Sequence, residues 1–472
     1  MGEINRREVL KIGAVTLGAE FLHPPLRAQT RQPKKVIIAG GGIAGLCCGY
    51  ELMKRGHEVT ILEASGRPGG HVRTIHDPLP DGLYADVGAE QFTKPGYDLY
   101  WNYVREFGLT ALYYPRREHM LRFIGGKMYT EEMLADPGVL NKLGLNQREA
   151  DFLRREPWWN LAMLYYKPYL DRFTDEYNPF HTGLDDLDRI TLADLLEKDH
   201  ASNAAIGFIG SSASALHALW HAAILNMRGV PLWPPKVYRL RGGNQLMTDT
   251  FAQRLGERVR VGSPVTGIEH DAAHVTVSYR EFGKEKKMEA DFLVCCMSAV
   301  MLRQIPVKPP WPEKKAFPIE NMPYYTEVRV VFQSRTKFWR QDEISPNMEF
   351  GEPTLYDAWP MSEEVETQRG ILESTAGALT TPEEAVATYR KYYPGKSEDI
   401  EQTFCHDWSR DPWAMACETV EYKPGELRRI WPAVMEPVGR IYFAGAYTDN
   451  LNWGQEAATR SANRIAEAID RA

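Results

Sequence analysis

The chain has 472 residues, which is more than a single domain usually contains and leaves ample length for a large core. Hydrophobic residues make up 43% and charged residues 25%, a globular composition that argues against disorder. The formal net charge is −7 and no long basic run occurs, which disfavours nucleic acid and anionic membrane surfaces as partners.

The first 29 residues resemble a twin-arginine export signal. Arginines at 6–7 precede a short apolar run over 12–22, two prolines and a candidate cleavage site near Ala28. That run contains Glu20, and neither it nor any later stretch reaches the ~18 apolar residues of a membrane helix. Export to the periplasm or the medium is the favoured location. The alternative is an ordinary basic first helix on a cytoplasmic protein.

A strand–turn–helix–strand pattern follows, typical of dinucleotide-binding sites. A buried strand over 35–39 leads through a glycine-rich turn into a helix over 46–55. A second strand over 58–62 then ends at an acidic residue, Glu63, which suits ribose hydroxyls and repels a 2′-phosphate. The sequence therefore predicts a dinucleotide site at the turn.

The residues of the turn have separate physical roles. Gly40 permits the tight turn, Gly42 lets the backbone approach a pyrophosphate, and Gly45 allows close packing of helix on strand. The helix N-terminus offers free N–H groups and a positive dipole end to phosphates. The predicted dinucleotide-binding residues here are Gly40, Gly42, Ile43, Ala44, Gly45, Glu63 and Ala64.

A second glycine motif, R-P-G-G-H-V-R-T, occupies 67–74. Gly69 and Gly70 bring backbone close to the cofactor, and Arg67 and Arg73 add positive charge near a pyrophosphate. With the D-G-L-Y-A-D-V-G-A stretch at 81–89, this motif resembles the flavin amine oxidase superfamily. That superfamily includes monoamine, polyamine and L-amino acid oxidases, with phytoene desaturase and protoporphyrinogen oxidase as cousins. The resemblance implies FAD, since a nicotinamide dehydrogenase would not need the second motif.

The C-terminus carries the other half of this resemblance. A strand over 439–445 ends in a glycine turn, and 452–458 opens a final helix that runs to about residue 472. In the family this helix directs its N-terminus at the pyrimidine edge of the flavin, where its dipole stabilises negative charge. The resemblance adds these cofactor positions: Gly88, Ala89, Glu90, Val265, Cys417, Gly445, Ala446, Trp453, Gly454 and Gln455.

The fold class that the resemblance implies is α/β, of the glutathione reductase-like type with two dinucleotide-binding domains. It implies a discontinuous Rossmann-type FAD-binding domain, a helical insertion and a mixed α+β substrate domain. The expected bounds are 34–120, 235–300 and 426–472 for the FAD-binding domain, 121–234 for the insertion and 301–425 for the substrate domain.

The reaction implied is oxidation of an amine or L-amino acid to the imine, with hydride transfer to flavin N5 and reduction of O2 to H2O2. The cofactor carries the hard step, so no acid–base triad is required. Trp408 and Cys417 keep the nine-residue separation found in monoamine oxidases, which places Trp453 beside the substrate path. Cys417 falls where monoamine oxidases attach the flavin, but noncovalent binding is the favoured interpretation.

Three positions depart from the family pattern around the flavin. Arg329 replaces a lysine that holds a water near N5, and arginine does not readily deprotonate, which puts fast reaction with oxygen in doubt. Glu418 replaces the second aromatic residue of the substrate cage, where it either binds a cationic group or points away. Ala446 stands where an acidic residue often contacts the ribityl or phosphate region.

The sequence leaves more than one alternative for the substrate class and for the electron acceptor. Many L-amino acid oxidases bind the substrate carboxylate with an arginine at the position of Gln91, so an amine without a carboxylate is somewhat favoured, unless Arg117 or Arg241 substitutes. One alternative is a desaturase or dehydrogenase on an apolar substrate with an acceptor other than oxygen. Another is a flavin-binding protein without turnover. A homodimer is one of the open assembly states.

Metal chemistry is not predicted. The six cysteines include adjacent pairs at 47–48 and 295–296, which are interpreted as small buried hydrophobes, and no C-x-x-C spacing occurs. His217 and His221 are four residues apart in a predicted helix, but they lack the H-E-x-x-H glutamate and a third ligand.

Overall fold

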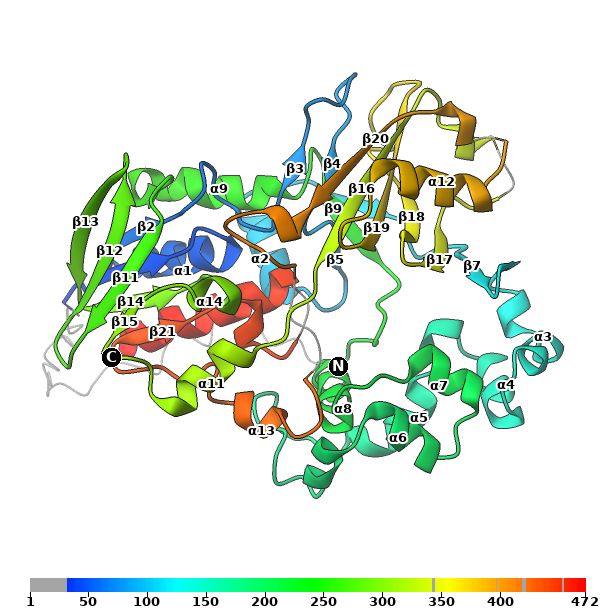
Figure 1. Ribbon diagram of the computed structural model, residues 1–472, viewed down its shortest axis with the longest axis horizontal. Helices are drawn as coiled ribbons and strands as arrows, with labels where there is room; N and C mark the ends of the chain where they lie inside the picture. The colour runs from blue at the N-terminus through cyan, green and yellow to red at the C-terminus, as the bar shows by residue number, and fades with distance from the viewer. Residues whose placement is uncertain (1–31, 342–343, 396, 418–421, 452–453) are drawn as a thin grey trace, which may run out of the picture. The chain divides into compact units, whose positions relative to one another are not determined.

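The computed structural model describes residues 32–341, 344–395, 397–417, 422–451 and 454–472. The chain divides into the units Met1–Pro33 and Lys34–Ala472, and the second carries the fold (Figure 1). The predicted export signal, Glu418 and Trp453 lie outside the described residues. No helix in the described ranges is long and apolar enough to cross a membrane.

A five-stranded parallel sheet forms the centre of the dinucleotide-binding part. In spatial order its strands are β10 (Val259–Arg260), β2 (Glu58–Leu62), β1 (Lys35–Ala39), β14 (Phe292–Cys295) and β21 (Ile441–Phe443). The central strand β1 is an apolar run because both of its faces are buried. Val36 and Ile38 enter one core, and Ile37 and Ala39 enter another.

Helices pack on one face of this sheet and a β-meander on the other. The helices are α1 (Ile43–Lys54), α2 (Asp98–Glu106), α9 (Gln245–Leu255) and α14 (Gly454–Arg471), and Figure 1 shows α1 and α14 side by side. The meander contains β11 (Val265–His270), β12 (Val275–Glu281), β13 (Lys284–Ala290) and β15 (Val307–Lys308). The predicted buried character of Cys47, Cys48 and Cys295 is confirmed, whereas Cys296 is only partly buried and lines the cavity described below.

A second, seven-stranded sheet lies above the cofactor region. Its strands, in spatial order, are β20 (Ile400–Asp407), β16 (Glu327–Ser334), β19 (Gly370–Gly377), β18 (Leu355–Met361), β17 (Met348–Glu352), β7 (Leu121–Ile124) and β8 (Lys127–Tyr129). One face is apolar and packs on α12 (Pro382–Tyr392), through residues such as Val328, Val330 and Phe332. Side chains alternate along a strand, so residues 327, 329 and 331 of β16 lie on the opposite face.

The predicted helical insertion over 121–234 begins with strands instead of helices. β7 and β8 form a hairpin whose turn, Gly125-Gly126, has positive φ at both residues (58° and 76°), the backbone conformation that favours glycine. The hairpin joins the second sheet through β17. The helices that follow are α3 (Pro137–Lys142), α4 (Gln147–Leu153), α5 (Met163–Leu170), α6 (Leu192–Lys198), α7 (Asn203–Ile209) and α8 (Ala215–Met227).

Short elements connect these parts. A three-stranded sheet contains β5 (Phe92–Thr93), β9 (Val237–Leu240) and β6 (Ala111–Tyr114), and β3 (Thr74–Ile75) pairs with β4 (Ala85–Asp86). The remaining helices are α10 (Ala299–Leu302), α11 (Glu313–Asn321) and α13 (Leu427–Ile430).

Candidate functional site

A cavity of about 950 Å³ begins at the carboxyl ends of the parallel strands and reaches the second sheet and the helical insertion. Its volume suits a dinucleotide with a small substrate. Most of the predicted cofactor residues line it: Gly40, Gly42, Ile43, Ala44, Glu63, Ala64, Arg67, Gly69, Gly70, Gly88, Ala89, Glu90, Val265, Cys417, Gly445, Ala446, Gly454 and Gln455. Gln91 and Arg329 line it too, whereas Gly45 and Arg73 do not.

The two glycine motifs form one cradle. The Gly69 N–H donates to the Gly41 carbonyl over 2.8 Å, which holds the second motif against the first. A Cβ added at Gly42 would have its nearest protein atom, the Cα of Gly70, 3.9 Å away. The bare backbone at Gly42 is therefore not required by protein packing, and it suits the close approach of a pyrophosphate.

Gly45 has a different role, because a Cβ there would lie 1.9 Å from the Gly40 carbonyl oxygen. This contact is the close approach of helix to strand that the motif predicts. Nearby, the buried Glu63 carboxylate accepts hydrogen bonds from Gly41 N (2.7 Å) and from Ser65 N and Oγ (2.8 and 2.7 Å). These donors fix the carboxylate in the cavity wall, where it suits a ribose hydroxyl. The residues present thus fit a dinucleotide.

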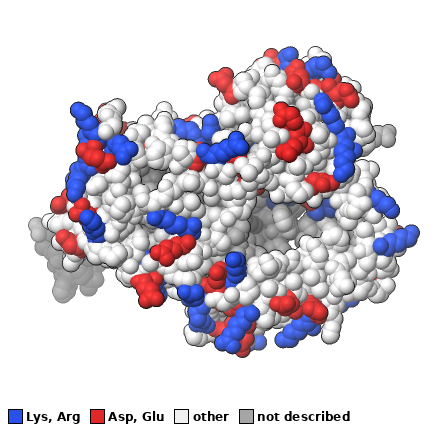
Figure 2. Space-filling model, in the orientation of Figure 1, with Lys and Arg blue, Asp and Glu red and all other residues white. Residues whose placement is uncertain are grey.

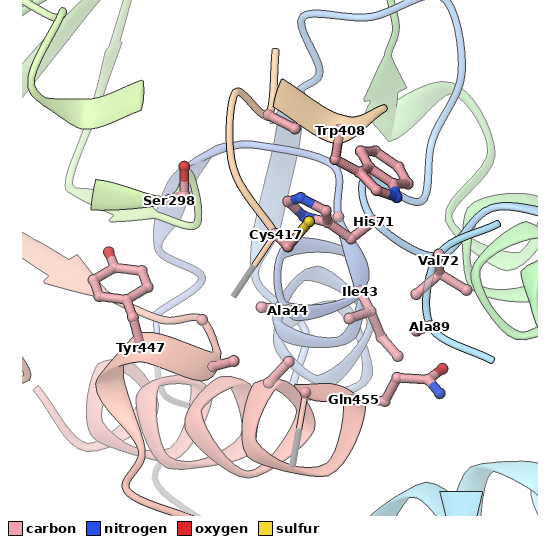
Figure 3. Close-up of a pocket in the computed structure, with 18 of the residues that line it drawn as sticks. Ile43, Ala44, His71, Val72, Ala89, Ser298, Trp408, Cys417, Tyr447 and Gln455 are labelled. Carbon is pink, nitrogen blue, oxygen red and sulfur yellow. The ribbon is translucent and has the colours of Figure 1, made fainter. Parts of the chain in front are cut away.

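Away from the Glu63 carboxylate, the cavity has a wall of aromatic and sulfur-containing side chains. Figure 3 shows His71, Trp408 and Cys417 on one side and Gln455 on the other. The rings of His71 and Trp408 are 4.6 Å apart, and His71 Nε2 lies 2.5 Å from the Ala416 carbonyl oxygen. The Sγ of Cys417 accepts a hydrogen bond from the Glu327 N–H at 3.2 Å.

Arg329 projects from the polar face of the second sheet into the cavity. Its Nη2 donates to the Gly88 carbonyl (3.2 Å) and lies 3.4 Å from Glu327 Oε1, while its Nη1 lies 3.8 Å from Glu90 Oε2. Burial opposes this charge, but the neighbouring carboxylates of Glu327 and Glu373 keep the pKa of Arg329 above its ordinary value. Arg329 is therefore a permanent cation beside the Gly88 backbone, which is predicted to contact the cofactor.

Arg116 completes this network from the loop after β6. It forms ion pairs with Glu90 and with Asp357 (3.0 Å), and its Cζ lies 3.4 Å above the Trp359 ring. Glu90 thus lies between two arginines. Sequence reasoning identified Glu90 and Arg329 but missed Arg116 and Glu327. The period-two pattern of β16 could have indicated Glu327, two residues before Arg329.

Glu373 lies on β19, the strand that pairs with the Arg329 strand β16, and it is fully buried. Neither of its carboxylate oxygens has a hydrogen-bond partner among the described residues. Burial raises the pKa of Glu373 to about 8, and Arg329 offsets this only in part. In an unfolded chain the pKa of glutamate is about 4.3. The folded protein thus favours the protonated acid, and its stability falls as the pH rises between these two values.

Replacing Glu373 with Gln is expected to reduce this loss of stability. The amide has nearly the shape of the neutral acid and does not ionise. We expect the variant to show a smaller fall in Tm between pH 6 and pH 9 than the wild type, measured by thermal unfolding. An identical fall in both proteins would contradict a buried, protonated Glu373.

The helical insertion supplies the third wall, which is mainly apolar and aromatic. The lining residues from this part of the chain include Trp159, Tyr166, Phe208, Ile209, His221, Leu232 and Trp233. Burial lowers the pKa of His221 to about 4, so its ring is neutral at pH 7, and its buried Nε2 has no hydrogen-bond partner among the described residues. Of the two candidate anion-binding residues, Arg117 lines the cavity, whereas Arg241 is exposed and is not among the lining residues.

His217 has a structural environment. Its Nδ1 accepts a hydrogen bond from the Tyr422 N–H (3.2 Å), its Nε2 lies 2.7 Å from Asn450 Oδ1, and its ring stacks on Tyr422. Within the described ranges, no group of three or more His, Cys, Asp or Glu side chains could hold a metal ion.

Comparison with known proteins identifies the family. Residues 43–470 match the family described as flavin containing amine oxidoreductase. Two L-amino-acid oxidases are similar: that of Daboia russelii is 27% identical, over 94% of this chain and 90% of the relative, and that of Protobothrops flavoviridis is 25% identical over the same shares.

Solved structures agree with this match at the level of the fold. Putrescine oxidase bound to putrescine superimposes with a TM-score of 0.75 at 18% identity, over 93% of this chain and 99% of the other. Cyclohexylamine oxidase from Brevibacterium oxydans IH-35A gives a TM-score of 0.74 at 20% identity and the same coverage. The predicted fold class and the FAD cofactor are confirmed. The chain belongs to the family of flavin-containing amine oxidoreductases.

Proposed function

We propose that the protein oxidises the carbon next to the amine of an amino acid or amine, giving the imine and H2O2. The observation that carries this proposal is that one continuous cavity joins the glycine cradle to the Arg329 face and to an aromatic wall. When bound there, FAD would supply the hydride acceptor and the route for electrons to oxygen.

The residues of the chain would bind and orient the substrate. The aromatic wall of the insertion excludes water and favours a neutral amine. The His221 ring lies in this wall and is neutral at pH 7, because burial lowers its pKa to about 4. Arg329, held by Glu327 and the Gly88 carbonyl, keeps positive charge beside the reacting region. Trp453 and Glu418 remain proposals as substrate-cage residues, because they lie outside the described ranges.

A second candidate is a dehydrogenase that passes electrons to an acceptor other than oxygen. The observation that favours it is Arg329 itself, which is held by Glu327 and the Gly88 carbonyl and does not release a proton. Both candidates share the reduction of the flavin by the substrate. They differ in the molecule that then accepts the electrons from the reduced flavin.

Anaerobic mixing with a panel of amino acids and amines tests the proposal. We expect at least one substrate to bleach the flavin absorbance, and the reduced protein to produce H2O2 when air is admitted. Bleaching without peroxide would support the second candidate. A flavin that no member of the panel reduces would contradict both and leave a binding protein without turnover. Acid denaturation should release the flavin, since we propose noncovalent binding beside Cys417.

We also propose export of the folded protein by the twin-arginine route, and a homodimer as its assembly. Changing Arg6 and Arg7 together to Lys should retain the protein in the cytoplasm, as measured by cell fractionation. Unchanged export would contradict the first proposal, and a monomeric mass in solution would contradict the second.

A further inference from the structure

One arginine in the cavity wall, Arg117, has no acidic partner and a single hydrogen bond among the described residues. Arg117 lines the cavity, and its Nη1 donates to the Pro234 carbonyl at 2.5 Å. Its Cζ lies 5.0 Å from the centre of the Trp233 ring. No carboxylate within the described ranges lies within ion-pair distance of this guanidinium. Burial and the neighbouring Arg116 lower its pKa to about 10, so Arg117 is charged at pH 7.

The other arginines of the cavity wall each have two or more polar partners, although the Nε and Nη1 of Arg329 form no hydrogen bond with the described residues. Arg116 pairs with Glu90 and Asp357, and Arg329 with Glu327 and the Gly88 carbonyl. Arg67 donates to three backbone carbonyls, those of Pro68, Gly70 and Val72. Arg117 has one carbonyl and most of its donors remain available. A partly buried cation with free donors favours an anionic ligand, because desolvation is costly unless the charge is paired.

We infer that Arg117 binds the carboxylate of the substrate, so that the substrates are amino acids and not plain amines. This inference rests on the proposed function. The guanidinium can bind a carboxylate through two parallel hydrogen bonds, and Trp233 limits the positions that its plane can take. Gln91 is neutral and cannot supply this charge.

Arg117 lies in the same cavity as Gln91 and Arg329, close to an edge that is open to solvent. Trp233, beside it, is 49% exposed, so this edge of the cavity reaches solvent. Figure 2 shows the surface hollowed between the second sheet and the helical insertion. The aromatic wall would then receive the side chain of the amino acid, which favours apolar and aromatic side chains.

Matched pairs of substrates test this inference, each an amino acid and its decarboxylated amine, such as L-phenylalanine with 2-phenylethylamine and L-leucine with 3-methylbutylamine. The readout is the second-order rate constant of anaerobic flavin reduction, which does not depend on oxygen. For the wild type we expect the amino acid of each pair to be preferred. Arg117→Gln should lower the rate constant for amino acids about 100-fold and that for amines less than about threefold, because only the amino acid loses a charge-assisted pair.

Two further variants sharpen the experiment. Arg241→Gln removes an exposed arginine from outside the cavity and should behave as the wild type. Adding Gln91→Arg to the Arg117→Gln protein should restore a preference for amino acids. A non-reacting carboxylate such as benzoate should perturb the flavin spectrum of the wild type and bind at least about tenfold more weakly to Arg117→Gln.

The outcomes separate this inference from the proposed function. If the wild type is reduced by amines only, or if Arg117→Gln slows both members of each pair equally, the role of Arg117 is overturned while the proposed function stands. If no member of either class reduces the flavin, the proposed function itself fails.

Discussion

The Gly45→Ala variant is expected to lose FAD and to fold poorly. Gly45 lies inside α1, where alanine is ordinarily the better residue by roughly 0.5–1 kcal/mol. Here the new Cβ would lie 1.9 Å from the Gly40 carbonyl oxygen, a backbone atom that cannot move aside without shifting the turn. Such overpacking costs about 1–3 kcal/mol or more and displaces the turn that we propose binds the cofactor. We expect a clearly lower Tm and a flavin-free preparation.

Gly42→Ala is the matched control, because it adds the same atom at a position without protein neighbours. Gly42 has φ −71° and ψ 178°, which any residue can adopt, and its nearest contact would be 3.9 Å away. The apo variant should therefore unfold at the wild-type temperature. Its FAD affinity should fall about 10-fold to 100-fold, as measured by fluorescence titration, because the methyl group occupies the path of the pyrophosphate. Equal destabilisation of both variants would contradict a ligand-based role for Gly42.

The cofactor half of the site could be predicted from the sequence because its elements are consecutive. The strand β1, the turn and α1 are neighbours along the chain, so the spacing of Gly40, Gly42 and Gly45 already specifies the local geometry. The second glycine motif follows after about twenty residues and folds back onto the first. Local propensity, turn chemistry and burial all favour the same structure here.

The substrate half could be predicted less well, since its residues meet only in the tertiary fold. Glu90, Arg116, Arg329 and Asp357 come from four different segments, and no spacing in the sequence indicates that their charges pair. The β7–β8 hairpin was assigned to the helical insertion, although the Gly125-Gly126 pair between two apolar runs is a recognisable hairpin signal. The pairing of β7 with β17 is nonlocal and has no such signal.

We expect Arg329→Lys to accelerate the reaction of the reduced flavin with oxygen by at least about tenfold, since a positioned proton donor typically contributes more than this. The guanidinium is held by the Gly88 carbonyl and by Glu327, and the adjacent carboxylates keep its pKa above the ordinary value. It therefore contributes positive charge but no proton. A lysine keeps the charge, is shorter, leaves room for a water, and can change its protonation state.

The control for Arg329→Lys is to measure flavin reduction by substrate separately from flavin reoxidation by oxygen. Anaerobic reduction by substrate should change less than about threefold, because the positive charge is retained. Arg329→Met should slow this step, because it leaves Glu327 without its cation and Glu90 with Arg116 alone. Reoxidation is measured by mixing the reduced protein with oxygenated buffer in a stopped-flow instrument. If Arg329→Lys reoxidises no faster than the wild type, proton release at this position does not limit oxygen reactivity. The arginine would then serve mainly to neutralise the carboxylates that share its side of the cavity.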